Sequence, residues 1–221
     1  MKYSLNQVKN LVKNFIEVSS ITFLGSGNHS EAFCINDHMV IKLPKHRKAS
    51  DCLKTEIRVL LGLEGKTRLA IPNVLSHGVF LSGNEEFAYF VSKRLQGKKL
   101  SRAEFLRLDQ HTTALNAKRI AQFLYELHQE KQILPIKRKD LCLLHGDFSL
   151  NHVLFNEENT VCGILDFGDS RIGRAKSDFI YLLDHEDEEE FGVEFGKMVL
   201  SNYESFMSSP SKAHESAINT F

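Results

Sequence analysis

The sequence predicts an α+β fold, in which an N-terminal antiparallel sheet carrying one helix precedes a mostly helical C-terminal lobe. Two observations support this prediction. Short strand-like runs separated by turn residues dominate up to residue 94, whereas a helix-capping motif and apolar residues at helical spacing follow it. The length of 221 residues suits two lobes. We therefore expect a lobe over 1–94 and another over 95–221.

The predicted N-terminal lobe begins with an amphipathic helix, because apolar residues recur at helical spacing from Leu5 to Ile16. The runs ITFLG, EAFCIN and MVIKL, separated by SGNHS and NDH, indicate a meander of antiparallel strands. A helix capped by Ser50 is expected over DCLKTEIRVLLGLEG. Two further strands, VLSHGVFL and EFAYFVSK, complete the predicted sheet.

The predicted C-terminal lobe opens with the capping box SRAE at Ser101, and an apolar stripe that ends near Leu127 indicates a second helix. The runs DLCLL, VLFN and VCGILDFG then indicate a strand, a loop and a hairpin. The polar tail from about Ser208 is expected to be poorly ordered.

The composition argues against several classes of protein. Basic and acidic residues both number 28, so the chain lacks the basic excess of a nucleic-acid binder. The N-terminus lacks the apolar core of a signal peptide, and no window is apolar enough to span a bilayer. We therefore expect a cytoplasmic protein with no nucleic-acid or membrane partner. The four cysteines form no CxxC pair, which favours reduced, buried thiols over a zinc site.

A glycine-bearing turn, Gly25-Ser26-Gly27, separates the first two predicted strands. Backbone amides in such a turn can approach and cradle phosphate oxygens. The alternative is a plain hairpin turn, in which glycine is the default residue.

A lysine and a glutamate occupy positions where the pattern calls for apolar residues. Lys42 interrupts the strand MVIKL, and Glu56 lies within the apolar stripe of the following helix. The two would satisfy each other if the helix packs on the strand. Such a pair can hold a lysine ready for nucleotide phosphates, and the alternative is a purely structural salt bridge.

The stretch LLHGDFSLNHVLFN places several polar residues between two apolar runs. Asp147 lies in the predicted turn, Asn151 and His152 follow it, and Asp166 ends the next hairpin strand. Because a hairpin returns the chain on itself, Asp166 can come near Asn151 and His152. Two such groups can hold Mg²⁺ between phosphates, while Asp147 faces an incoming hydroxyl.

The order GxG, VIK, a helix glutamate, HGD and DFG resembles the protein kinase-like fold. Protein kinases usually carry arginine where Gly146 stands, and the segment between Gly168 and FIYLL is too short for a peptide-binding activation loop. The acceptor is therefore expected to be a small molecule. The runs HGDFSLNHVLF and CGILDFGDS are similar to the aminoglycoside phosphotransferase family, most of all to its 2″-phosphotransferase branch.

The resemblance implies a resistance enzyme that transfers the γ-phosphoryl group of ATP or GTP to an aminoglycoside, with Mg²⁺. Asp147 would be the catalytic aspartate, which orients and deprotonates the acceptor hydroxyl. Lys42, backed by Glu56, would hold the phosphates beside the Gly25–Gly27 turn. The backbone near Lys93 and Leu95 would contact the base. We expect a monomer.

The resemblance implies that Asp166 and one of two neighbours bind the metal. Magnesium prefers oxygen, which favours Asn151, whereas the resemblance implies His152. Only one of the two neighbours can point into the site, and on the resemblance we predict His152. By resemblance, Asp178 braces the catalytic loop from below.

The acidic run LLDHEDEEEFGVEF is either a solvated helix start or a docking surface for a polycationic acceptor. On the second interpretation, Glu190 and Glu194 contact its amines. The acceptor lobe looks shortened relative to the family, both before His145 and after Tyr203. The alternatives are a kinase of another small alcohol, such as choline, homoserine or a macrolide, and a truncated or degenerate nucleotide-binding homologue.

Overall fold

The computed structural model describes residues 1–184 and 191–208. The chain forms two compact units, and each is treated separately below. Unit 1 comprises Met1–Glu64, Pro72–Leu95 and Phe167–Asp169, and unit 2 comprises Gly65–Ile71, Gln96–Asp166 and Ser170–Phe221. The predicted α+β class is confirmed, since a large antiparallel sheet lies in unit 1 and the longest helix in unit 2.

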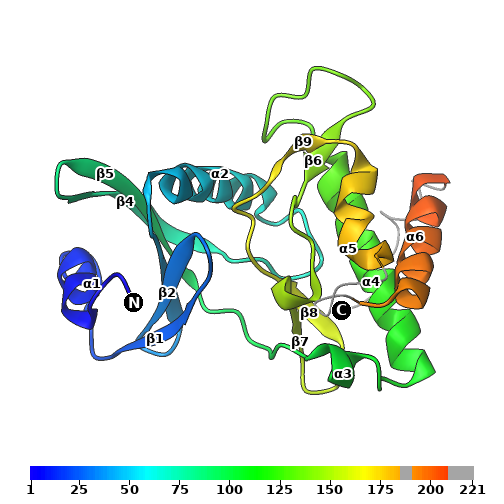
Figure 1. Cartoon of the computed structure of the whole chain (residues 1–221), viewed down its shortest axis with the longest axis horizontal. Coiled ribbons are helices and arrows are strands. Elements are labelled where there is room, and N and C mark those ends of the chain that lie inside the picture. The colour runs from blue at the N-terminus through cyan, green and yellow to red at the C-terminus, as the bar shows by residue number, and fades with distance from the viewer. Residues whose placement is uncertain (185–190, 209–221) are drawn as a thin grey trace. The chain divides into compact units, whose positions relative to one another are not determined.

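The five-stranded antiparallel sheet of unit 1 has the order β1-β2-β3-β5-β4 (Figure 1). Its strands are β1 (Ile21–Ser26), β2 (Ser30–Ile35), β3 (Met39–Pro44), β4 (Val74–Ser82) and β5 (Glu85–Lys93). Each predicted strand is confirmed. The order makes β3 a central strand, paired with both β2 and β5.

A tight turn between β2 and β3 sets their register. Asn36 and Asp37 both adopt left-handed backbone conformations, with φ of 52° and 62°, within the three-residue connection between Ile35 and Met39. This turn places Ile35 opposite Met39 and therefore Ala32 opposite Lys42. The position of Lys42 in the sheet thus follows from the local chemistry of the turn.

Two helices cover opposite faces of this sheet. Helix α1 (Leu5–Val12) packs Val8 and Val12 into a core with Ile41, whereas α2 (Arg47–Leu63) meets the face that carries Lys42. Successive residues of a strand point to opposite faces, which explains the division. The predicted first helix was too long, because α1 ends at Val12.

The predicted start of α2 was also wrong. His46 caps the helix, with its Nδ1 accepting from the amide of Ala49 at 3.2 Å. Ser50 is fully buried inside the helix, and its hydroxyl accepts from the Ala88 amide at 2.8 Å. The serine therefore binds a neighbouring strand, which no local capping pattern reveals.

Unit 2 combines helices with two small antiparallel sheets. Its elements are α3 (Arg102–Phe105), α4 (Gln110–Gln129), β6 (Cys142–Leu144), the 3₁₀ helix η1 (Leu150–His152), β7 (Val153–Phe155), β8 (Val161–Ile164), β9 (Arg171–Gly173), the 3₁₀ helix η2 (Ala175–Phe179), α5 (Ile180–Leu183) and α6 (Val193–Ser208). The sheets pair β6 with β9 and β7 with β8. The predicted capping box at Ser101 is present, but it caps the short α3, and α4 has its own cap at Asp109.

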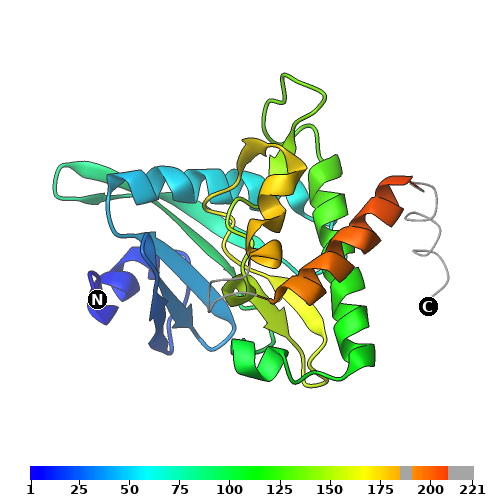
Figure 2. The same cartoon turned by 45° about the vertical axis from the view of Figure 1, so that its right-hand side comes forward.

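The core of unit 2 lies beside α4, which α6 crosses (Figure 2). Phe148 is 1% exposed and stacks on Phe123 of α4 and on Phe191. This burial anchors the chain directly after Asp147. Among the described residues, no helix is both long and apolar enough to cross a bilayer. The tail predicted from Ser208 onward falls outside the described range after that residue.

Candidate functional site

The predicted site residues fall into two groups. Unit 1 holds Gly25, Ser26, Gly27, Lys42, Glu56, Lys93 and Leu95, and unit 2 holds Asp147, His152, Asp166 and Glu194. Glu190 lies outside the described residues.

Lys42 and Glu56 form the ion pair that the sequence predicted. The Lys42 Nζ lies 2.8 Å from Oε2 and 3.0 Å from Oε1 of Glu56. Glu56 is 2% exposed and Lys42 15% exposed. The desolvated carboxylate fixes the ammonium group on the sheet, and the ammonium is the more accessible partner.

The glycine turn between β1 and β2 does not need glycine for its own geometry. Neither Gly25 nor Gly27 has a positive φ, and a Cβ at either position would meet no atom within 4 Å. The Gly27 amide donates to the Ser30 carbonyl at 3.0 Å, and the Lys45 ammonium donates to the Gly27 carbonyl. A Cβ would therefore fit at both positions, and glycine there leaves the backbone open to close approach by a ligand. Ser26 ends β1, opposite Glu31.

The two residues predicted to contact a base lie at the end of β5 and after it. The amide of Lys93 donates to the Asn73 carbonyl at 3.0 Å. Leu95 is half-buried in the connection that follows β5.

The loop after β6 turns sharply at Gly146, whose φ is 90°. Asp178 from η2 holds this turn. Its Oδ2 accepts from the His145 amide at 2.8 Å, and its Oδ1 accepts from the Gly146 amide at 2.9 Å. One buried carboxylate thereby fixes two successive peptide groups directly before Asp147, which agrees with the predicted bracing role of Asp178.

His152 lies between Asp147 and Asp166. Its Nδ1 donates to the Asp147 carbonyl at 2.7 Å and lies 3.8 Å from Oδ2 of the same residue. Its Nε2 lies 3.8 Å from Oδ2 of Asp166. Because Nδ1 donates in this bond, Nε2 is the ring nitrogen on the side of Asp166. The neighbouring Asn151 is exposed.

The hairpin of β7 and β8 brings Asp166 to this position. Val153 pairs with Ile164, and the Leu165 amide donates to the His152 carbonyl at 2.8 Å. Asp166 itself has a φ of 65°, a left-handed conformation that costs a residue with a side chain about 1 kcal/mol or more. Strain of this kind is concentrated at functional sites.

A buried polar network supports the loop and includes residues that sequence reasoning missed. His128 Nε2 lies 3.0 Å from Asp178 Oδ2, and His128 Nδ1 lies 2.8 Å from the Tyr203 hydroxyl. The sequence does mark His128 in one way, because it lies inside the apolar stripe of α4, four residues after Leu124. His145 also contributes, since its Nε2 donates to the Leu165 carbonyl at 3.0 Å.

Burial and hydrogen bonding set the charges in this network. Burial lowers the pKa of His145, which keeps the ring neutral. Burial alone would raise the pKa of Asp178, but the hydrogen bond from His128, the electrostatic interactions with His128 and His145, and the Gly146 amide together lower it. The bracing group is therefore a carboxylate.

His152 and Asp166 offer two donors to a metal ion. Within the described ranges, no cluster of three histidine, cysteine or acidic side chains could hold a metal alone. Magnesium takes few protein ligands and completes its octahedron with waters and substrate phosphates. The pair therefore fits Mg²⁺ that is held together with a nucleotide.

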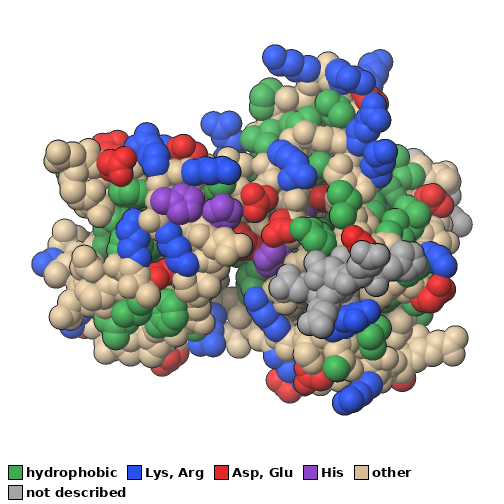
Figure 3. All heavy atoms as spheres, in the orientation of Figure 1, with side chains coloured by type: hydrophobic (Ala, Val, Ile, Leu, Met, Phe, Trp, Pro, Cys, Tyr) green, Lys and Arg blue, Asp and Glu red, His purple; other side chains and the backbone are tan. Residues whose placement is uncertain are grey.

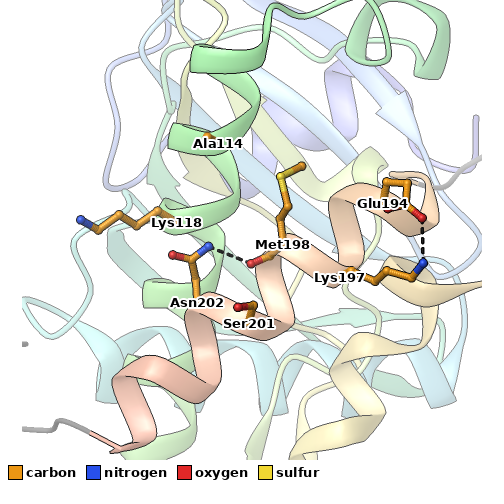
Figure 4. A pocket seen from close by; sticks show the side chains of 7 residues that line it. All are labelled: Ala114, Lys118, Glu194, Lys197, Met198, Ser201 and Asn202. Atoms are coloured by element: carbon orange, nitrogen blue, oxygen red, sulfur yellow. Dashed lines mark hydrogen bonds and ion pairs between the residues drawn. The ribbon is translucent and has the colours of Figure 1, made fainter.

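Glu194 lines a groove of about 490 Å³ between α4 and α6 (Figure 4). Its carboxylate pairs with Lys197 at 2.7 Å, and Met198 points between the helices. The side chain is 84% exposed, so an amine could approach it only in competition with Lys197.

The neutral overall composition conceals a basic segment between α4 and β6. Lys and Arg side chains gather over it (Figure 3). Lys137, Arg138 and Lys139 are all exposed, and Asp140 pairs with Arg138 at 2.7 Å. The twelve residues between α4 and β6 contain no helix or strand, in agreement with the predicted short connection. Cations would be repelled from this part of the surface.

Comparison with solved structures identifies the fold. The chain matches the gentamicin complex of APH(2″)-IIa at 23% identity and a TM-score of 0.77, over 98% of this chain and 86% of that one. It matches the GDP complex of wild-type aminoglycoside 2′-phosphotransferase-IIIa at 22% identity and a TM-score of 0.76, over 95% and 85%. The macrolide 2′-phosphotransferase MphH from Brachybacterium faecium matches at 14% identity and a TM-score of 0.64, over 91% and 83%.

A family model adds sequence evidence to this likeness of fold. It describes the phosphotransferase enzyme family, APH, and matches residues 129–214, which include Asp147, His152, Asp166 and Asp178. The predicted resemblance is thereby confirmed: the chain has the kinase-like fold of the aminoglycoside phosphotransferases, and its segment 129–214 matches the phosphotransferase enzyme family.

Proposed function

We propose that the protein is a small-molecule kinase that transfers the γ-phosphoryl group of ATP or GTP to a hydroxyl of an aminoglycoside. The observation that carries the proposal is the position of His152 between the carboxylates of Asp147 and Asp166. The carboxylate of Asp147 adjoins the potential metal donors, and Asp178 holds the two peptide groups directly before it. Such an arrangement suits phosphoryl transfer, in which positioning and charge neutralisation supply most of the rate.

In this proposal, Asp147 orients the acceptor hydroxyl and accepts its proton as the oxygen attacks the γ-phosphorus. The bond between that phosphorus and the bridging oxygen breaks, and the nucleoside diphosphate leaves. Asp147 is 38% exposed, which leaves its carboxylate accessible to a substrate. The hydrogen bond from His152 to its carbonyl limits the orientations that its backbone can adopt.

His152 and Asp166 are assigned to Mg²⁺, which neutralises phosphate charge when it is bound. The assignment of His152 over Asn151 is supported by its position: Nε2 lies 3.8 Å from Oδ2 of Asp166, while Nδ1 donates to the Asp147 carbonyl. Oxygen donors suit magnesium better than nitrogen, but Asn151 is exposed and has no contact of this kind.

Unit 1 is assigned to the nucleotide. Lys42 would contact the phosphates, and Glu56 would hold its ammonium in place. The Gly25–Gly27 turn, including Ser26, would receive phosphate oxygens, because neither glycine carries a side chain that would block their approach. Lys93 and Leu95 would contact the base through their backbone.

The aminoglycoside is proposed as acceptor because the fold matches proteins described as complexes with gentamicin or streptomycin. Glu194, and Glu190 outside the described residues, would contact its amines. The basic surface at Lys137–Lys139 would not attract such a cation, so recognition is assigned to the acidic part of unit 2. The proposal includes a cytoplasmic, monomeric enzyme whose product no longer binds RNA well.

A macrolide is the second candidate acceptor, because MphH shares the fold, although its TM-score of 0.64 is lower than those of the aminoglycoside enzymes. Choline and homoserine have no comparable observation in their favour. A degenerate, non-catalytic homologue would retain nucleotide binding without transfer.

Mass spectrometry of a panel of acceptors tests the proposal. The protein is incubated with Mg²⁺, with ATP or GTP, and with aminoglycosides, a macrolide, choline or homoserine. A phosphorylated aminoglycoside is the expected result, and the GTP arm identifies the donor. A phosphorylated macrolide alone would replace the aminoglycoside assignment. Nucleotide binding with no product from any acceptor would contradict the kinase proposal.

A further inference from the structure

We infer that Tyr203 is a positioning residue for the catalytic loop: through His128 and Asp178, its hydroxyl fixes the backbone that carries Asp147. The inference rests on the proposed function only in calling this loop catalytic. Tyr203 lies in α6, far along the chain from the loop, and nothing in its local sequence marks it.

The contacts form one continuous chain across unit 2. The Tyr203 hydroxyl lies 2.8 Å from His128 Nδ1, and His128 Nε2 lies 3.0 Å from Asp178 Oδ2. Asp178 in turn accepts from the amides of His145 and Gly146 at 2.8 and 2.9 Å. The three side chains are buried, with exposed fractions of 7%, 2% and 2% for Tyr203, His128 and Asp178. Water therefore has little access to replace any link.

The carboxylate of Asp178 fixes the direction of the hydrogen bond from His128. Asp178 is ionised and can only accept, so His128 Nε2 must carry a proton. The Tyr203 hydroxyl lies 2.8 Å from Nδ1, where it can donate to the tautomer whose proton is on Nε2. Burial raises the pKa of Tyr203, with the Cys142 thiol and Asp178 contributing, so the phenol keeps its proton. Tyr203 thus selects the His128 tautomer that donates to Asp178.

The fixed tautomer matters because Asp178 serves two peptide groups at a sharp turn. Gly146 adopts a φ of 90°, and its amide and that of His145 both need the carboxylate at one place. The other tautomer would turn a lone pair toward a lone pair of Asp178. The carboxylate would then move, and the turn before Asp147 would no longer be held in one conformation.

The remaining contacts of Tyr203 allow its hydroxyl to be tested alone. Its ring packs edge-to-face on His128, with centroids 5.5 Å apart, and on Phe179, with centroids 5.2 Å apart. A Tyr203→Phe variant keeps both ring contacts and removes only the donor. Tyr125→Phe is the matched control: Tyr125 lies in α4, packs on Phe206 of α6 with centroids 5.9 Å apart, and its hydroxyl bonds to no described residue.

The first measurement is amide hydrogen exchange by NMR, which needs no activity. In Tyr203→Phe, exchange at His145 and Gly146 is expected to accelerate about three- to tenfold, the equivalent of one net hydrogen bond. The amide of Ile41 in unit 1 serves as an internal reference and should not change. ¹⁵N shifts of the His128 ring should report Nε2–H in the wild type and a mixed population in the variant.

The second measurement is steady-state transfer. We expect kcat to fall about three- to tenfold in Tyr203→Phe while KM for the nucleotide stays within about twofold. Tyr125→Phe should match the wild type in both kcat and exchange. Unchanged exchange at His145 and Gly146, or an equal acceleration at Ile41, would overturn the inference. If no acceptor is phosphorylated by any variant, the proposed function fails, but the exchange result still decides the role of Tyr203.

Discussion

The Nε2 of His152 lies 3.8 Å from Oδ2 of Asp166, while its Nδ1 is occupied by the Asp147 carbonyl. The histidine therefore has one nitrogen available on the side of Asp166. Its neighbour Asn151 is exposed. This relationship makes the choice between the two predicted metal ligands testable.

The metal assignment predicts that His152→Ala lowers transfer about 10- to 100-fold and raises the Mg²⁺ concentration needed for half-maximal activity. Loss of one of two protein donors weakens metal binding without removing the phosphates. Activity measured over a Mg²⁺ titration checks this. Asn151→Ala is the control and should behave like the wild type. The reverse pattern would assign the metal to Asn151.

The role of Asp147 predicts that Asp147→Ala lowers kcat by about 10²- to 10⁴-fold, because the hydroxyl loses its positioned proton acceptor. Nucleotide affinity, measured by calorimetry, should stay nearly unchanged, since the nucleotide is assigned to unit 1. The thermal unfolding midpoint should also hold, because the carboxylate is 38% exposed. Normal turnover by this variant would show that the loop has another role.

Two variants of the Lys42–Glu56 ion pair distinguish a structural role of Lys42 from a functional one. Lys42→Met leaves a carboxylate that is 2% exposed without its ammonium partner, so we expect unfolding to become easier by about 3 kcal/mol. Adding Glu56→Gln removes that charge and should restore most of the stability. Denaturant unfolding and transfer assays are compared for both variants. If the double variant also regained transfer, Lys42 would serve only the fold.

A substitution in the Gly25–Gly27 turn is predicted to change nucleotide affinity without changing the stability of the fold. Gly27→Ala should keep the stability within about 0.5 kcal/mol, because a Cβ there meets no atom within 4 Å. Nucleotide affinity should fall about tenfold if phosphate oxygens approach this backbone. Gly83→Ala is the opposite control: its φ of 66° should destabilise the fold by about 1 kcal/mol and leave nucleotide affinity alone. Equal affinity for Gly27→Ala and the wild type would leave the turn purely structural.

The raised pKa of Tyr3 predicts that the folded protein becomes less stable at alkaline pH. Burial and the charge of Glu31 raise its pKa from 10.0 to about 12. The folded state therefore keeps a proton that the unfolded state releases above pH 10, so this contribution is complete below pH 10 and declines as the pH rises toward 12. Between pH 9 and pH 11, the wild type should lose about 1.4 kcal/mol more than Tyr3→Phe in guanidinium unfolding. Parallel losses in the two proteins would contradict the shift.

The sequence by itself determined the strands of unit 1, because each is a short apolar run between turn residues and its ends depend on local chemistry. The Asn36–Asp37 turn is the clearest example. It also determined that Lys42 and Glu56 would pair, since two charges at apolar positions of adjacent elements have few other ways to be satisfied. The order of polar residues from Asp147 to Asp166 indicated the resemblance that the fold and the family match confirm.

Only the tertiary structure decided which residues those local signals serve. Ser50 has the sequence of a helix cap, yet it binds a strand, and His46 caps α2 instead. The exposure of Asn151 and the orientation of His152 depend on a hairpin that closes beyond them. Tyr203 reaches the loop through His128, 75 residues away in the chain. Capping and periodicity act over a few residues, whereas a buried polar group takes whichever partner the packing brings near it.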